Sequence, residues 1–216
     1  MQGTKGRRSL NNVEGYHCNV APASSLSDPL KIMQATVPHP VDLFTAVLEA
    51  TGGEIERINE PRQVASAIAK IVQGQGAREV LYEMTDMAEE MNLKLLLTAY
   101  GIDLVSVENA GEKAAGFRVS LTGAELGIAE TGTLVLGGQP GGWGLASILP
   151  WVHVVLLSAE AIFADLPTAF QVLENRMSAG DRDWVWITGP SRTADIGHTL
   201  VMGAHGPNAL HVVVVG

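Results

Sequence analysis

Residues 130–160 read ETGTLVLGGQPGGWGLASILPWVHVVLLSAE, with no charged side chain between the two terminal glutamates. An uncharged run of this length suggests a membrane span, but glycines and prolines interrupt it repeatedly between residues 137 and 150. Pro150 alone would cost a helix interior about 3 kcal/mol. The stretch therefore predicts a buried strand, a glycine-rich loop, a short helix and a second buried strand.

The same alternation extends along the chain in both directions. Short apolar runs predict strands at 79–82, 103–107, 133–136, 153–157, 184–188, 200–202 and 210–215, with a further apolar run at 93–97. Helical spacing predicts helices at 41–51, from 61 to the glycines at 74 and 76, at 86–91 and at 162–177, and a turn at 205–208 joins the last two strands as a hairpin. We expect an α/β fold with one mostly parallel, doubly wound sheet covered by helices on both faces.

Composition separates a tail from a domain and limits the partners. Residues 1–35 are rich in Gly, Ser, Asn and Pro without periodicity, which predicts an N-terminal tail or extended arm, and residues 36–216 form the α/β domain. Hydrophobic residues make up 46% of the chain, enough for a packed core. The formal net charge of -9 argues against nucleic acid and against an anionic membrane surface as partners.

Cysteine usage limits the redox chemistry. The chain has a single cysteine, Cys18, which excludes an internal disulfide, a zinc cage and a four-thiolate iron–sulfur site within it. Any redox role must therefore belong to a partner or to a bound cofactor that needs no thiolate, and we predict neither a metal nor a cofactor in this chain. No secretory signal is visible in the sequence, so the cytoplasm is the expected compartment.

The segment 122–133, TGAELGIAETGT, places small residues and two carboxylates directly before a predicted strand. Glu130 is a candidate base because a carboxylate beside a sheet is desolvated. The ligand-site hypothesis includes Glu130, Thr131, Gly132 and Thr133. The structural alternative is that the threonines bond local backbone while Glu130 faces water or pairs with an arginine.

The segment 189–195, GPSRTAD, follows the predicted strand at 184–188. Pro190 suits the first position of a helix, so we expect a helix to start here with free N–H groups at the carboxyl end of a strand. Together with Arg192, the residues Gly189, Ser191 and Thr193 would then form a site for a small anion. Ordinary helix capping by Ser191 or Thr193 is the alternative.

The remaining polar positions are less specific. The glycine-rich loop at 137–144 lacks the Lys-Ser/Thr pair of a P-loop, so it either brings backbone close to a ligand or is a tight turn. His39, His153 and His211 flank apolar runs, as structural histidines do, and the histidine spacings match no metal site. His205, in a Gly-Pro turn, is a second catalytic candidate beside Glu130, and the pattern assigns no catalytic residue.

Three stretches carry a family resemblance: TGAELGIAETGTLVL at 122–136, LPWVHVVL at 149–156, and GPSRTADI, TLVMGAHGP and LHVVVV within 189–215. On these the chain resembles the lactate utilization protein C family, also called the LUD domain family, over roughly residues 40–216. Residues 1–35 depart from the family pattern, as do Gly197 and His198 where an acidic residue is common.

The resemblance implies a fold like that of the glucosamine-phosphate isomerase, ribose-phosphate isomerase and CoA-transferase group. It also implies service in the oxidation of L-lactate to pyruvate beside two iron–sulfur partner proteins, as the subunit that carries no cluster. Two functions stay open. One is a ligand-binding or assembly subunit, and the other is a small-molecule enzyme that uses Glu130 as base or nucleophile.

Overall fold

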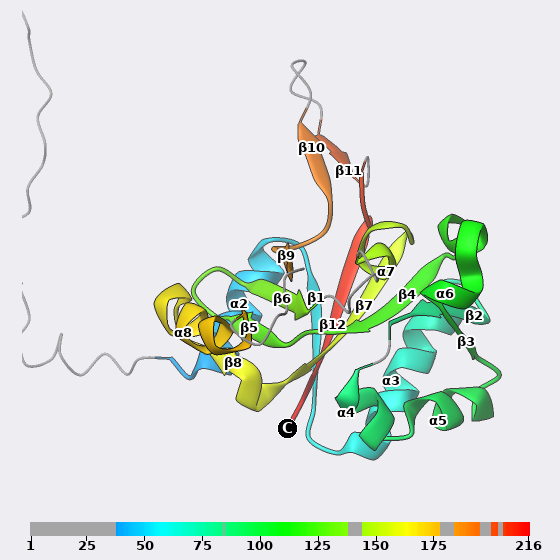
Figure 1. The fold of residues 1–216 in the computed structure, drawn as a ribbon, viewed down its shortest axis with the longest axis horizontal. Helices are drawn as coiled ribbons and strands as arrows, with labels where there is room; N and C mark the ends of the chain where they lie inside the picture. The colour runs from blue at the N-terminus through cyan, green and yellow to red at the C-terminus, as the bar shows by residue number, and fades with distance from the viewer. Residues whose placement is uncertain (1–37, 84, 138–143, 178–183, 195–199, 203–204) are drawn as a thin grey trace, which may run out of the picture. The chain divides into compact units, whose positions relative to one another are not determined.

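A six-stranded parallel sheet forms the centre of the domain (Figure 1). The computed structural model describes residues 38–83, 85–137, 144–177, 184–194, 200–202 and 205–216. In spatial order the strands are β1 (Glu54–Ile58), β12 (Ala209–Val215), β7 (Val152–Ser158), β4 (Val119–Gly123), β2 (Glu79–Tyr82) and β3 (Asp103–Ser106). Every neighbouring pair runs parallel. The predicted α/β class with a mostly parallel sheet is confirmed.

A second, four-stranded sheet corrects the expectation of a single sheet. Its order is β8 (Ile162–Phe163), β5 (Leu126–Ile128), β6 (Thr133–Gly137) and β9 (Trp184–Ile187). β5 and β6 pair antiparallel, because the four residues between them are far fewer than a parallel crossover requires. The predicted strands at 133–136 and 184–188 therefore exist but lie outside the main sheet.

Helices cover both faces of the main sheet. They are α2 (Pro40–Ala50), α3 (Pro61–Gly74), α4 (Asp86–Glu90), α5 (Leu93–Ala99), α6 (Val107–Ala110), α7 (Leu145–Ile148) and α8 (Leu166–Met177), with 3-10 turns η2 (Gly111–Gly116) and η3 (Ala159–Ala161). The side chains of β7 are buried on both faces of the sheet, so helices must cover each face. Val154 and Leu156 join the cluster with α3 and α5, whereas Val155 and Leu157 join the cluster with α2.

Two local predictions at the C-terminal end are wrong. No helix starts at Pro190, because residues Arg192–Ala194 form β10 and pair antiparallel with β11 (Leu200–Met202). Nor do the strands at 200–202 and 210–215 form a hairpin, since β12 lies between β1 and β7 in the parallel sheet. The run Val212–Val214 is buried throughout, and only a central strand has cover on both faces.

Several elements were not predicted. β1 has mostly exposed, charged residues and pairs with β12 alone at the edge of the sheet. β4 and β5 were not predicted as strands, and β5 lies within the candidate ligand segment 122–133. The apolar run at 93–97 belongs to the helix α5.

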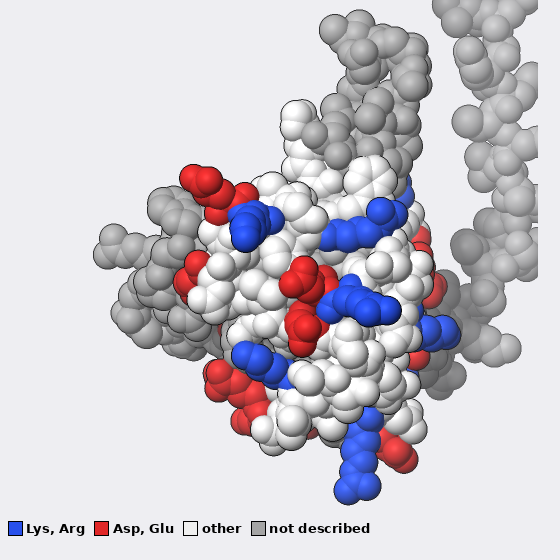
Figure 2. Space-filling view, turned by 90° about the vertical axis from the view of Figure 1, so that its right-hand side faces the viewer, with Lys and Arg blue, Asp and Glu red and all other residues white. Residues whose placement is uncertain are grey.

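Some predictions concern residues outside the described ranges. Cys18, His198 and the whole predicted tail lie there, so the domain boundary at residue 35 stays a prediction. Within the described ranges no helix is long and apolar enough to cross a membrane. On the face shown in Figure 2, Lys and Arg lie among Asp and Glu. A phosphate backbone would require a continuous basic stripe, and this face does not have one.

Candidate functional site

The main sheet has a topological switch point between its neighbouring strands β2 and β4. The chain leaves β2 toward β3 on one side and leaves β4 toward β7 on the other. Ligands of open α/β sheets bind outside the carboxyl ends of the strands at such a point. A cavity of about 240 Å³ lies there, which we call the carboxyl-edge cleft; its polar lining comprises Glu83, Thr85, Asp86, Thr122, Glu125 and Ser158.

Glu83 is the first residue beyond β2. Its backbone N–H donates to the Leu121 carbonyl oxygen at 3.1 Å, which extends the strand pairing. Its Oε1 accepts a hydrogen bond from the backbone N–H of Ala146 in α7 at 3.3 Å. Burial raises the pKa of the Glu83 carboxyl, and the charge of Glu108 adds to this, while the Ala146 N–H opposes both. The raised pKa makes this carboxyl a better proton acceptor than an ordinary surface glutamate.

Thr85 and Gly123 form one wall of the cleft. The Thr85 Oγ1 accepts from the Ala88 N–H at 3.3 Å and caps the N-terminus of α4. Its side chain lies directly on Gly123, the last residue of β4, where a Cβ would collide with the threonine. Only glycine therefore allows α4 to begin this close to the sheet.

A second cavity, of about 280 Å³, lies at the amino ends of β7 and β12, and we call it the amino-edge cavity. Its polar lining comprises Ser147, His153, Thr188, Ser191 and His205, and its apolar walls include Ile148, Trp186 and Leu210.

His153 is the buried polar group of the amino-edge cavity. Its side chain is only 1% exposed, and its Nε2 lies 2.8 Å from the hydroxyl of Thr122. Burial lowers the pKa of His153 to about 3, so the ring is neutral at physiological pH. Within the described part of the chain its Nδ1 has no hydrogen-bond partner.

The two cavities share structural elements. Thr122 lines the carboxyl-edge cleft and contacts His153, which lines the amino-edge cavity. In α7, Ala146 donates to Glu83, while the next residue, Ser147, lines the amino-edge cavity and donates to the Gly144 carbonyl oxygen at 2.6 Å. The helix α7 therefore contributes residues to both sites.

Of the predicted ligand residues at 130–133, Thr133 contacts Thr188, the residue that follows β9. The Thr133 hydroxyl lies 2.7 Å from the Thr188 hydroxyl and 2.8 Å from that of Thr131. Gly132 has φ +62° and lies against the backbone of Leu48 in α2, where a Cβ would clash. The Glu130 carboxylate is exposed and accepts a hydrogen bond from the Leu166 N–H at 2.8 Å, at the start of α8.

The predicted residues at 189–193 separate into two groups. Gly189 and Ser191 line the amino-edge cavity, together with His205. The Arg192 guanidinium lies instead against Gly52, just beyond α2, and the side chain of Thr193 is outside the described part of the structure. Neither Glu130 nor Arg192 is among the described residues that line the two cavities. Ligand binding at these residues remains a prediction.

Sequence reasoning missed Glu83 and Thr85, although a signal was present. The strand at 79–82 and the helix at 86–91 were both predicted, and the polar residues between them had to follow the carboxyl end of a strand. It also assigned His153 a satisfied structural role, whereas only its Nε2 has a described partner. His39 and His211 are structural: His39 accepts from the Val41 N–H at 3.4 Å, and His211 lies 3.3 Å from Glu54.

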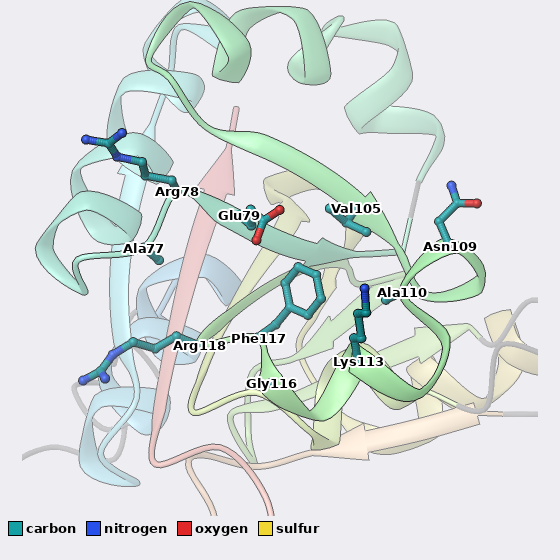
Figure 3. A pocket seen from close by; sticks show the side chains of 10 residues that line it. All are labelled: Ala77, Arg78, Glu79, Val105, Asn109, Ala110, Lys113, Gly116, Phe117 and Arg118. Atoms are coloured by element: carbon teal, nitrogen blue, oxygen red, sulfur yellow. The ribbon is translucent and has the colours of Figure 1, made fainter.

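A larger cavity, of about 560 Å³, lies beside the amino end of β2 (Figure 3). Its lining includes Arg78, Lys113 and Arg118. Figure 3 shows that Arg78 and Arg118 extend to one side, apart from Lys113. These cations do not converge on one point, as the recognition of an anion requires. The described residues also contain no group of three or more metal-ligating side chains.

Comparison with known proteins places this fold in a family. The model of the LUD domain matches residues 41–215. A protein of Neisseria meningitidis is 38% identical over 47% of this chain and 42% of its own length. Lactate utilization protein C of Bacillus licheniformis is 27% identical over 64% of this chain and 63% of its own length. The chain thus spans less than two thirds of either relative.

A solved structure supports the fold. The crystal structure of a DUF162 family protein from Deinococcus radiodurans superimposes with a TM-score of 0.61 at 21% identity, over 82% of this chain and 96% of that one.

Proposed function

Since the chain belongs to the LUD domain family, we propose that it serves L-lactate oxidation to pyruvate in the cytoplasm, as a cluster-free subunit beside two iron–sulfur lactate utilization proteins. Relatives from several bacteria bear the name lactate utilization protein C, which supports this role. The single cysteine, Cys18, cannot hold a four-thiolate cluster. The iron–sulfur groups would therefore belong to the partners.

Within that system the chain binds a small hydroxy acid in the carboxyl-edge cleft. The observation that carries this proposal is the half-buried carboxyl of Glu83 at the switch point of the sheet. When protonated, Glu83 donates a hydrogen bond to a ligand carboxylate, and the Thr85 hydroxyl adds a second donor. When ionised, Glu83 adds a negative charge to a lining that also holds the carboxyl groups of Asp86 and Glu125, and it repels the same ligand. Binding should accordingly weaken as the pH rises through the raised pKa of Glu83.

Calorimetric titration of L-lactate tests the ligand site. Replacing Glu83 by Gln leaves a neutral donor, so the variant should bind lactate with little dependence on pH. At a pH where Glu83 is protonated, E83A should bind at least about tenfold more weakly, because a hydrogen bond to a charged group is worth about 1.5–3 kcal/mol. Arg192→Ala is the matched comparison for the other predicted site and should bind normally. Loss of binding in Arg192→Ala with normal binding in E83A would instead favour the segments at 130–133 and 189–193.

Anaerobic co-purification from the native host tests the partner role. The complex should contain iron and acid-labile sulfide, whereas the isolated chain should contain neither and should not oxidise lactate alone. Stoichiometric iron in the isolated chain would contradict the proposal.

A second candidate is a small-molecule enzyme in which a carboxylate acts as base or nucleophile. The position and raised pKa of Glu83 favour it for that role over Glu130, whose carboxylate is engaged by the first turn of α8. The two candidates differ in E83Q: an enzyme would lose turnover while keeping its affinity for the ligand, and a binding subunit has no turnover to lose.

A further inference from the structure

The amino-edge cavity combines apolar walls with neutral polar groups. Its described lining contains no Asp, Glu, Lys or Arg. Ile148, Trp186 and Leu210 supply apolar surface, and serine, threonine and histidine side chains supply the hydrogen-bonding atoms. A ligand pocket typically has this character, with a few polar groups that fix orientation among apolar walls.

Two buried polar atoms near this cavity lack partners. The Nδ1 of His153 and the Oγ of Ser120 have no hydrogen bond within the described part of the structure. The two residues are opposite each other in the pairing of β4 with β7. An unsatisfied buried polar atom costs about 1–3 kcal/mol. Folding has already removed water from Nδ1 of His153, so a ligand that bonds to this atom does not have to displace water from it.

We propose that the amino-edge cavity is a binding site for a small uncharged organic molecule that carries one hydroxyl or amide group on an apolar body. The polar group bonds to Nδ1 of His153, and the body packs on Ile148 and Leu210. A charged ligand is disfavoured because the described lining offers no opposite charge to offset its desolvation. The volume of about 280 Å³ suits a molecule of about one ring.

The alternative is that ordered water satisfies these atoms, as it does for many buried polar groups. A cavity of that kind discriminates little among organic molecules that share one ring. The two possibilities therefore differ in the binding of three probes of similar size and different charge: phenol, benzoate and benzylamine.

Titration of the intact chain with each probe, followed through the imidazole ¹⁵N signals of His153, decides between them. Phenol should shift the His153 Nδ1 signal and bind at least tenfold more tightly than benzoate or benzylamine. Equal affinities, tighter binding of either charged probe, or an unchanged His153 signal at saturating phenol would overturn the proposal.

Two neighbouring exposed residues provide a matched pair of variants. Ile148 lines the cavity, whereas Leu149 does not, and their exposed fractions are 45% and 37%. Ile148→Trp should fill the cavity and weaken phenol at least tenfold, while Leu149→Trp should leave it unchanged. Equal effects of the two variants would refute the site. Lactate affinity measured in Ile148→Trp reports on the carboxyl-edge cleft separately, so either site can fail without the other.

Discussion

The carboxyl-edge cleft and the amino-edge cavity lie at opposite edges of the main sheet, and burial shifts the pKa of Glu83 in the first and of His153 in the second in opposite directions. Burial raises the pKa of Glu83 in the cleft and lowers that of His153 in the cavity. Both shifts favour the neutral form, because a charge loses solvation inside the protein. The two residues differ in how deeply they are buried. Glu83 follows the end of a strand and retains access to water, whereas His153 is the second residue of β7 and is enclosed.

This contrast predicts that the amino-edge cavity makes the protein sensitive to acid. Below the ordinary His153 pKa of 6.5 the unfolded chain binds a proton, whereas the folded chain does not until about pH 3. Stability is therefore complete above pH 6.5 and falls as the pH decreases toward 3. Between pH 6.5 and 5 this single group should remove roughly 1.5 kcal/mol of unfolding free energy. Urea denaturation at a series of pH values measures it.

The matched variants for this prediction are H153Q and H205Q, which remove a buried and an exposed histidine. H153Q should lose that part of the pH dependence, and H205Q should keep it. If both variants retain the slope of the wild type, His153 is not neutral in the folded state.

The carboxyl-edge cleft depends on close packing at Gly123, where a side chain has no room beside Thr85. G123A should displace Thr85, remove the N-cap of α4 and lower the unfolding free energy by about 1–2 kcal/mol. Gly116 is the control, because a Cβ there would meet no atom within 4 Å. G116A should change stability far less than G123A when both variants are compared with the wild type by thermal denaturation. Similar losses in both variants would show that Gly123 has no special role.

The sequence predicted most strands but not which sheet they join. Apolar runs such as 153–157 are visible because buried strands carry no charge, so β7 was located almost to the residue. β1 was invisible because Glu54, Glu56 and Arg57 face solvent at an edge. The segment after β9 was predicted to start a helix at Pro190, because a proline also suits a helix start, and only the pairing of β10 with β11 shows that a strand follows.

The candidate site was less predictable than the fold, because a site depends on which segments meet. Thr133 and Thr188 are distant in sequence, yet their hydroxyls lie together, and Thr188 was not among the predicted ligand residues. Glu130 and Arg192, however, face other neighbours, the start of α8 and Gly52. No local pattern in the sequence indicated that the Glu83 carboxylate would accept a hydrogen bond from Ala146 in α7.

In the cleft, the sign of the pH effect is reversed. Because the folded-state pKa of Glu83 is raised above its ordinary 4.5, the folded chain binds the proton more tightly than the unfolded chain. Its contribution to stability is present at low pH and is lost as the pH rises above 4.5. E83Q should therefore be slightly more stable than the wild type at pH 8, by less than about 1 kcal/mol, since solvent screens a partly exposed group. Lower stability of E83Q at pH 8 would mean that the ionised carboxylate makes a net favourable contact.

The smallest effect concerns communication between the two cavities. Ser147 and Ile148 line the amino-edge cavity, and the preceding residue, Ala146, donates to Glu83. At 3.3 Å this hydrogen bond is long, so a small movement of α7 on binding phenol should change its strength by a few tenths of a kcal/mol, a fraction of the roughly 1 kcal/mol typical of such a bond. The amide signal of Ala146 should shift with the same affinity as the His153 ring. In E83Q the titration should still shift His153 but move Ala146 differently, because the acceptor is now an amide oxygen. An Ala146 signal that stays unchanged while His153 saturates would show that α7 is rigid and that the two cavities act independently.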